Sequence, residues 1–127
     1  MSTNAPFVDN SYKWAGGGFL SSAGDLVKFG NAMLSDTLMS VETIKKLTTS
    51  QKTSDGKETG YGMGFFTGTT DSGIKYFGHG GGSVGGISDL TIYPAQKLVV
   101  AIVTNDTRAS FKGRHRLAEL FMEEIRE

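Results

Sequence analysis

Apolar residues recur at helical spacing in two segments of the first half of the chain. After Ser22 they fall at positions 26, 29, 33 and 34, and after Ser40 at positions 41, 44 and 47. Spacing of three to four residues is typical of an amphipathic helix, and serine is a favoured N-cap residue. Ser22 with Asp25 three residues later also resembles a capping box. The pattern predicts one helix that begins at Ser21 or Ser22 and a shorter one after Ser40.

The period of the pattern changes in the second half. Residues 61–67 alternate glycine with bulkier side chains, residues 74–79 are short and aromatic, and residues 87–93 have the composition of a strand. Residues 98–104 form a continuous apolar run, as expected of a strand buried on both faces. The four residues before this run begin with Pro94 and have the length of a hairpin loop. The last two strands are therefore predicted to be antiparallel neighbours, and the polar segment 50–59 a surface loop.

A final helix is predicted from Asn105-Asp106-Thr107, whose side chains are suitable N-caps, to about Glu127. Basic residues lie at its start and acidic residues at its end, the order that a helix dipole disfavours. A solvent-exposed face held by pairs such as His115–Glu119 is the favoured interpretation, and a docking surface is the alternative. The apolar stripe of this helix consists of Leu117, Leu120, Phe121 and Ile125.

These elements predict an α+β fold. An antiparallel sheet of three to four strands is expected to pack with two N-terminal helices and one C-terminal helix. The 127 residues suit a single domain, 1–127, with neither an internal repeat nor a dividing linker. Residues 1–12 have no clear periodicity and are expected to form a flexible or docking arm.

Composition narrows the function classes. The net charge is zero, which gives no reason to expect binding to nucleic acid. The chain has no cysteine, and His79 and His115 lie far apart, so we expect no metal site and no cofactor. No stretch approaches the roughly 18 apolar residues that cross a bilayer, and no signal peptide is visible. We therefore expect no membrane partner and, by default, a cytoplasmic location.

Glycine is concentrated in the segment 76–86, which includes a G-x-G-x-x-G pattern at Gly80, Gly82 and Gly85. A dinucleotide-binding motif must open a helix, but a strand-like segment follows here, so nucleotide binding is disfavoured. One remaining interpretation is a strand edge that a ligand approaches, with His79 pointing into the same space. The other is a tight glycine turn with His79 packed beside it. Spacing alone slightly favours the turn.

Four motifs in order, spanning about residues 7–125, resemble the C-terminal half of the class C β-lactamase-like serine hydrolases. They are the segments 14–29, 61–65, 79–86 and 99–105. The family includes D-Ala-D-Ala carboxypeptidases, class C β-lactamases and related esterases, and residues 7–34 are especially similar to its mitochondrial serine β-lactamase-like branch. The resemblance implies a partial β-lactamase/transpeptidase-like fold.

The same resemblance assigns a substrate-binding role to His79, Gly80 and Gly81. In the family this strand triad orients a substrate carboxylate or carbonyl and contributes backbone to an oxyanion hole. Many members carry a hydroxyl at the middle position, where this chain has Gly80, so a side-chain hydrogen bond to a substrate carboxylate is not expected here. The expected ligand is a small acyl or peptide-like molecule.

The nucleophile of the family is not found in the matched region. Its Ser-x-x-Lys motif and a second motif, Tyr-x-Asn or Ser-x-Asn, lie upstream in relatives. Ser54-Asp-Gly-Lys57 matches by letters, but about one such match is expected by chance, and it lies in the polar loop. Ser2-Thr-Asn4 at the chain start is equally unconvincing. We therefore name no catalytic residue and expect no hydrolysis by the isolated chain.

Three functional hypotheses follow from the family resemblance and the missing nucleophile. The first is a contributor to an acyl-serine hydrolase, completed by a partner chain that carries Ser-x-x-Lys. The second is a non-catalytic binding module that self-associates, as a homodimer or domain-swapped oligomer, to cover an open strand edge and an apolar face. The third is a fragment without an independent role.

Overall fold

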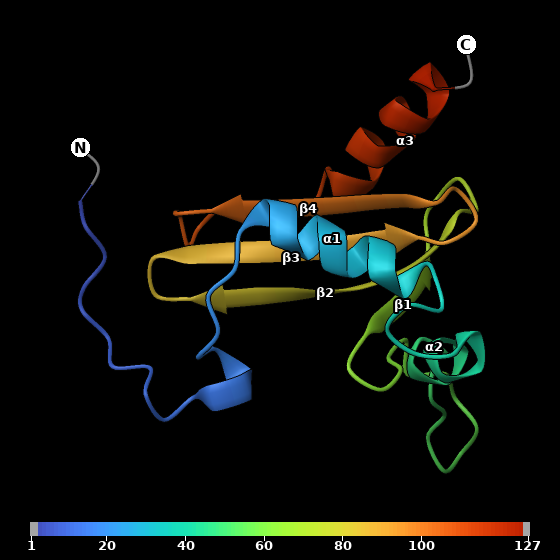
Figure 1. Cartoon of the computed structure of the whole chain (residues 1–127), viewed down its shortest axis with the longest axis horizontal. Helices are drawn as coiled ribbons and strands as arrows, with labels where there is room; N and C mark the ends of the chain where they lie inside the picture. Colours follow the sequence, from blue (N-terminus) through green and yellow to red (C-terminus); the bar gives the residue numbers. More distant parts are fainter. Residues whose placement is uncertain (1–2, 126–127) are drawn as a thin grey trace.

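The computed structural model describes residues 3–125, and Figure 1 shows their arrangement. These residues form three α-helices and one four-stranded antiparallel sheet, which confirms the predicted α+β class. None of the helices within this range has the length and apolar character needed to cross a membrane. Ser2 of the Ser2-Thr-Asn4 match and the predicted helix end at Glu127 lie outside the described residues.

The sheet is a meander in which each strand pairs with the next along the chain. Its strands are β1 (Phe66–Thr69), β2 (Lys75–Ser83), β3 (Gly86–Tyr93) and β4 (Leu98–Thr104), in the order β1-β2-β3-β4. The predicted four-residue hairpin joins β3 to β4. Its Lys97 N–H donates to the Pro94 carbonyl at 3.2 Å, and Lys97 takes the left-handed conformation with φ of 51°.

The two N-terminal helices begin where their serine caps predict. In α1 (Ala23–Met33) the Ser22 Oγ accepts from the Asp25 N–H at 3.1 Å. In α2 (Val41–Leu47) the Ser40 Oγ accepts from the Thr43 N–H at 3.2 Å. Each serine satisfies an N–H that has no partner within its own helix.

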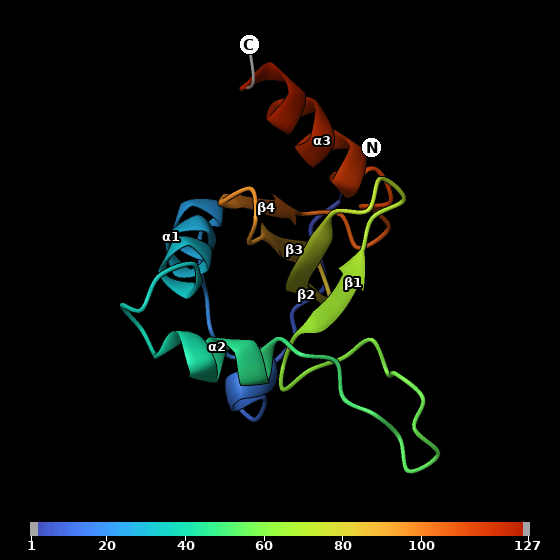
Figure 2. The same cartoon turned by 90° about the vertical axis from the view of Figure 1, so that its right-hand side faces the viewer.

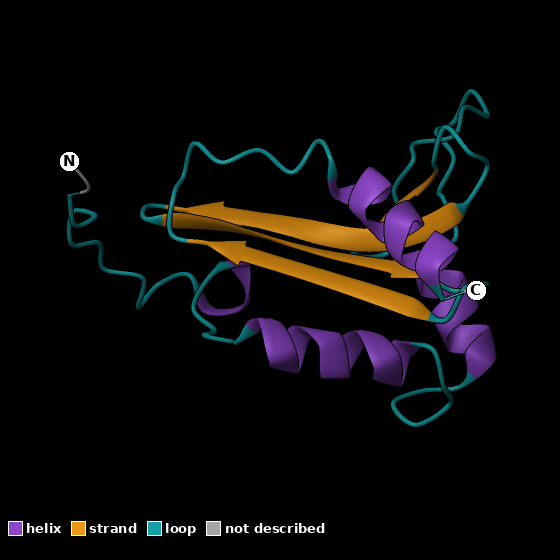
Figure 3. Cartoon of the chain, turned by 90° about the horizontal axis from the view of Figure 1, so that it is seen from above, coloured by secondary structure: helices purple, strands orange, loops and turns teal. Residues whose placement is uncertain are grey.

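One face of the sheet packs against α1 (Figure 3). The core there consists of Met33 from the helix and Phe77, Leu90 and Ile92 from β2 and β3. Gly30 allows the close approach, because a Cβ at this position would lie 2.4 Å from Val99 Cγ1 on β4. The opposite face packs against α3 (Arg114–Glu124), whose Ala118 and Met122 are buried with Tyr93. Figure 2 shows the sheet lying between α1 and α3.

The predicted start of the final helix is wrong. Helix α3 begins at Arg114, and the residues from 105 to 113 form turns. Asp106 closes one of these turns: its Oδ1 accepts from the Arg108 N–H at 2.9 Å, and its carbonyl from the Ala109 N–H at 3.2 Å. An aspartate side chain that bonds its neighbouring backbone competes with helix formation. Gly113 then occupies the N-cap position without a side-chain cap.

A pair predicted within this helix is also corrected, and the helix presents its apolar stripe to solvent. The His115–Glu119 pair does not form, because His115 bonds to Tyr93 while Arg116 lies 3.9 Å from Glu119. The apolar stripe does not face the sheet, since the smaller Ala118 and the flexible Met122 fill that space. The stripe residues are exposed, at 47% for Leu117, 46% for Leu120, 55% for Phe121 and 73% for Ile125.

Candidate functional site

Half of β2 has an unpaired edge. Strand β1 pairs with β2 only from Lys75 to Gly78, whereas β2 continues to Ser83 with β3 as its partner. The outer side of residues 79–83, called the free edge below, therefore has no neighbouring strand among the described residues. The hairpin turn that follows lies at Val84 and Gly85, with Gly85 at φ of 96°. Residues 80–82 are thus part of a strand, and the glycine-turn interpretation is wrong for them.

The hydrogen-bond pattern fixes which backbone groups face the free edge. The Thr70 N–H donates to the Ile74 carbonyl, which makes this pair the bonded type across β1 and β2. Bonded pairs alternate along antiparallel strands, so Gly78 also faces β1, and Gly80 and Gly82 face the same side. The two-residue turn after Ser83 agrees, because it requires Ser83 to bond with β3. The N–H and C=O groups of Gly80 and Gly82 therefore point outward.

Glycine is not required for packing at these edge positions. A Cβ at Gly80 would meet its nearest atom at 3.5 Å, and one at Gly82 at 3.4 Å, which is ordinary contact. Neither position has the positive φ that favours glycine. Gly78 differs, since its Cβ would lie 2.0 Å from the Leu90 carbonyl oxygen. The fold needs Gly78, whereas Gly80 and Gly82 leave the free edge bare of side chains.

His79 lies at the start of the free edge with both ring nitrogens occupied. Its Nδ1 lies 2.6 Å from the Gly80 carbonyl oxygen, and its Nε2 lies 2.9 Å from Tyr61 Oη. A carbonyl only accepts, so Nδ1 donates to it, and Nε2 forms a hydrogen bond with the Tyr61 hydroxyl. The Phe66 ring stacks on the imidazole, with centroids 5.0 Å apart. These contacts fix the direction of His79 and engage the Gly80 carbonyl, leaving the Gly80 N–H free.

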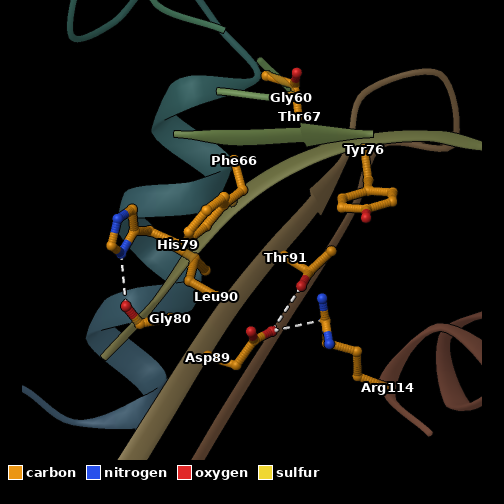
Figure 4. Close-up of a pocket in the computed structure, with 11 residues that line it drawn as sticks. Gly60, Phe66, Thr67, Tyr76, His79, Gly80, Asp89, Leu90, Thr91 and Arg114 are labelled. Atoms are coloured by element: carbon orange, nitrogen blue, oxygen red, sulfur yellow. Dashed lines mark hydrogen bonds and ion pairs between the residues drawn. The ribbon is translucent and has the colours of Figure 1, made fainter. Parts of the chain in front are cut away.

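A pocket opens on each side of His79 and Gly80. The pocket beside α1 has a volume of about 380 Å³, with Phe29, Phe65 and Ser88 in its lining. The pocket on the α3 face measures about 280 Å³, and Figure 4 shows the side chains that line it. The first is mainly apolar, and the second has charged groups in its floor. A ligand along the free edge would have access to both.

Three side chains form the polar floor of the second pocket. Arg114 Nε lies 3.5 Å from Asp89 Oδ2, and the Thr91 hydroxyl donates to the same oxygen at 2.7 Å (Figure 4). Asp89 is buried, and the Arg114 side chain is 29% exposed. The guanidinium compensates the buried carboxylate, so the floor carries little net charge. This pair also ties the start of α3 to β3.

Farther along the α3 face, Tyr93 and His115 form a second bonded pair. Tyr93 Oη lies 2.7 Å from His115 Nδ1. Burial raises the pKa of Tyr93 to about 12, so its hydroxyl keeps its proton and donates. Burial, with a smaller effect of the nearby Arg114 charge, lowers the pKa of His115. His115 is therefore neutral near pH 7, and the pair anchors α3 on the sheet.

Neither Ser-x-x-Lys match resembles a nucleophile site. Ser54 lies in the loop before β1, and Lys57 Nζ is 2.7 Å from Asp55. A second match, Ser72-Gly-Ile-Lys75, was not identified from the sequence. It lies in the turn before β2, where the Ser72 hydroxyl donates to Glu119. The family's nucleophilic serine opens a helix, and neither of these serines does. Within residues 3–125 no group of three or more potential ligands is arranged to hold a metal ion.

Several residues that shape the site were not found from sequence. Three of them belong to segments away from the glycine run and two follow it directly in β3, and strand pairing and the packing of α3 bring them together. No local spacing marks them, although Tyr61 lies within a motif that carried the family resemblance. These residues are Tyr61, Phe66, Ser88, Asp89 and Arg114.

The meander, its flanking helices and the glycine-lined strand edge define a β-lactamase-like domain. The family model described as Beta-lactamase matches residues 2–122, and the chain belongs to this family. A segment of 31 residues is 84% identical to the serine beta-lactamase-like protein LACTB, mitochondrial, of Homo sapiens, Mus musculus and Bos taurus. That segment covers 24% of this chain and 6% of each relative. The predicted family resemblance is confirmed.

A solved structure supports the same fold. The D-stereospecific amidohydrolase from Streptomyces sp. is similar with a TM-score of 0.57 and 25% sequence identity. The similarity covers 68% of this chain and 26% of the amidohydrolase. The matched part is thus about a quarter of that enzyme.

Proposed function

We propose that this chain supplies the substrate-binding strand of an acyl-serine hydrolase site. An extended peptide or peptide-like acyl ligand lies along the free edge, pairs with Gly80 and Gly82, and passes His79. The nucleophile comes from polypeptide that carries Ser-x-x-Lys, so the isolated chain binds without hydrolysing. One observation carries this proposal. Packing does not require glycine at positions 80 and 82, yet glycine at these positions leaves the backbone of the free edge uncovered by side chains.

Backbone groups at the free edge suit a substrate that contains amides. An extended ligand adds as a further strand, because alternating N–H and C=O groups match on both sides. The Gly80 N–H is the donor nearest His79, and a donor fixed in a strand stabilises negative charge on a carbonyl oxygen without reorganising. His79 acts as a positioning residue, since it holds the Gly80 carbonyl through Nδ1.

The names of the similar proteins favour the same reaction class. One is a serine β-lactamase-like protein and another a D-stereospecific amidohydrolase. Both names fit attack on an acyl carbon. In this chain Ser83 lies at the end of the free edge itself, and Ser88 lines the pocket beside α1. Both lie within strands rather than at a helix start, so we assign the nucleophile to another segment of polypeptide.

Two measurements test the binding and catalytic parts separately. Binding is measured by NMR while a short D-amino-acid peptide is titrated into the chain, and we expect shifts centred on the Gly80 and Gly82 amides. The variant Gly80→Pro removes the outward N–H and should weaken the shifts at least tenfold. Val41→Glu, at an exposed position of α2, is the matched control and should bind normally. Shifts that avoid the free edge would overturn the binding proposal.

Catalysis is tested by labelling with a fluorescent penicillin and a fluorophosphonate. The chain alone, a β-lactamase-family segment that contains Ser-x-x-Lys alone, and their mixture are compared. We expect labelling of the segment's serine only in the mixture, and less of it with Gly80→Pro. Labelling of the chain alone on one of its own serines would contradict the need for an external nucleophile. No labelling in any mixture would contradict the hydrolase assignment.

A further inference from the structure

Helix α3 presents two apolar faces, and the sheet covers one of them. Ala118 and Met122 are buried against Tyr93, while the apolar stripe of Leu117, Leu120, Phe121 and Ile125 is exposed. The members of the stripe follow one another at spacings of three, one and four residues, so they line one side of the helix. Figure 1 shows α3 rising from the sheet toward the C-terminus, away from the other helices. The stripe is thus accessible to a partner.

The charges of this segment change sign midway along it. Lys112, Arg114 and Arg116 lie at its start, and Glu119, Glu123 and Glu124 lie toward its end. The helix dipole disfavours this order at both ends, by about 0.3–1 kcal/mol for a charge in a terminal turn. Among residues 3–125 of the monomer only Arg116 spans the two groups, at 3.3 Å from Glu123 and 3.9 Å from Glu119.

We propose that the apolar stripe binds a second copy of this chain, with the two α3 helices antiparallel about a two-fold axis. Such a pair places the basic start of each helix beside the acidic end of the other. Leu117 of one copy then faces Phe121 of the other, Leu120 lies near the axis, and Arg116 approaches Glu124. A parallel pair would instead place like charges together, which costs stability. The same patch serves both copies, as an isologous dimer requires.

The contact is small, so the dimer is weak. A stripe of four apolar side chains offers less than the roughly 800 Å² per partner of a standard stable interface. Dissociation in the micromolar range is expected, with salt dependence, because the complementary charges are exposed. The stripe lies apart from the free edge, so this inference and the proposed function stand or fall separately.

Sedimentation velocity over a wide concentration range tests the dimer. The wild-type chain should shift from monomer to dimer as its concentration rises through the micromolar range. Phe121→Glu should weaken association at least tenfold and leave the circular dichroism spectrum unchanged. The matched control Val41→Glu, also at an exposed helical position, should dimerise normally. A monomer at every concentration, or equal effects of the two variants, would overturn the proposal.

A charge exchange tests the antiparallel arrangement. Arg116→Glu and Glu124→Arg should each weaken the dimer, and the double variant should restore it, because every reversed charge again faces its opposite. Failure of the double variant to recover would exclude this geometry. Dimerisation that survives Phe121→Glu would point to strand exchange or pairing at the free edge. Association only with an added segment of a longer hydrolase, and never with a second copy, would also overturn the inference.

Discussion

The glycines of β2 serve two purposes that single substitutions separate. Gly78 packs against the Leu90 carbonyl, whereas the outward backbone of Gly80 has no strand beside it. Proline at an outward position loses no ladder bond, but at Gly81 it removes an N–H that faces β3. Gly81→Pro should therefore cost about 1–3 kcal/mol of unfolding free energy, because its β3 acceptor loses its donor, and Gly80→Pro should cost less. Urea unfolding checks both values, and equal losses would contradict the derived strand orientation.

Tyr61 controls the direction of His79. Tyr61→Phe removes the hydroxyl that bonds to Nε2 while keeping the ring that meets Phe66 edge-on at 4.8 Å. A loss of about 0.5–1.5 kcal/mol in unfolding free energy is expected, as for a typical hydrogen bond. The imidazole ¹⁵N shifts of His79 should also change, at Nε2 far more than at Nδ1. Tyr12→Phe, at an exposed ring, is the control. Unchanged His79 shifts would show that the bond is absent in solution.

At the scale of elements, the packing of α1 on β4 depends on one residue without a side chain. Gly30→Ala would place a Cβ 2.4 Å from Val99 Cγ1, and overpacking of this kind typically costs about 1–3 kcal/mol. Gly24→Ala in the same helix meets nothing closer than 3.8 Å and should stabilise by about 0.5–1 kcal/mol. Thermal unfolding should therefore show a lower midpoint temperature for Gly30→Ala and a higher one for Gly24→Ala.

A double variant identifies the cause of the Gly30 effect. Val99→Ala removes the contacted methyl groups, so it should make Gly30→Ala less costly than it is in the wild-type background. If the stability losses of the two single variants simply add in the double variant, Gly30 is needed for a reason other than its contact with Val99.

The elements that sequence predicted well are those whose signals are local. Serine caps gave the starts of α1 and α2, and the proline-containing loop gave the last hairpin. The start of α3 was missed because Asp106 bonds a turn instead of capping a helix. Spacing identified the apolar stripe of α3 but not the residues that the sheet accepts, Ala118 and Met122, because shape complementarity is not visible in spacing.

The same distinction holds for the candidate site. The glycine run and its family resemblance pointed to His79, Gly80 and Gly81, and they left open whether the run formed a strand edge or a turn. The answer depends on where β1 begins: its first residue, Phe66, pairs with Gly78, so no β1 residue pairs with residues 79–83 of β2. Tyr61 and Arg114 arrive through the fold, from opposite sides of the sheet. Only long-range pairing could have revealed them.

At the scale of the whole molecule, the pair Tyr93–His115 should set the pH range of stability. His115 has a lowered pKa in the folded chain, so the unfolded chain binds more protons as pH falls below 6.5, and stability decreases there. Tyr93 has a raised pKa, about 12 against 10.0, so the unfolded chain ionises first as pH rises, and stability decreases from about 10 to about 12. Stability should be nearly constant between these limits.

Urea unfolding from pH 5 to 11 measures this profile, and two variants assign its limbs. His115→Gln should flatten the acid limb, and Tyr93→Phe the alkaline limb, whatever each does to stability at pH 7. The comparison therefore uses the slope of the unfolding free energy against pH, rather than the urea midpoint at a single pH. The surface carboxyls with lowered pKa, such as Asp25 and Asp106, titrate below 3.8 and so contribute outside this range. An acid limb that persists in His115→Gln would assign it to other groups and leave the titration of His115 without a role in the pH dependence.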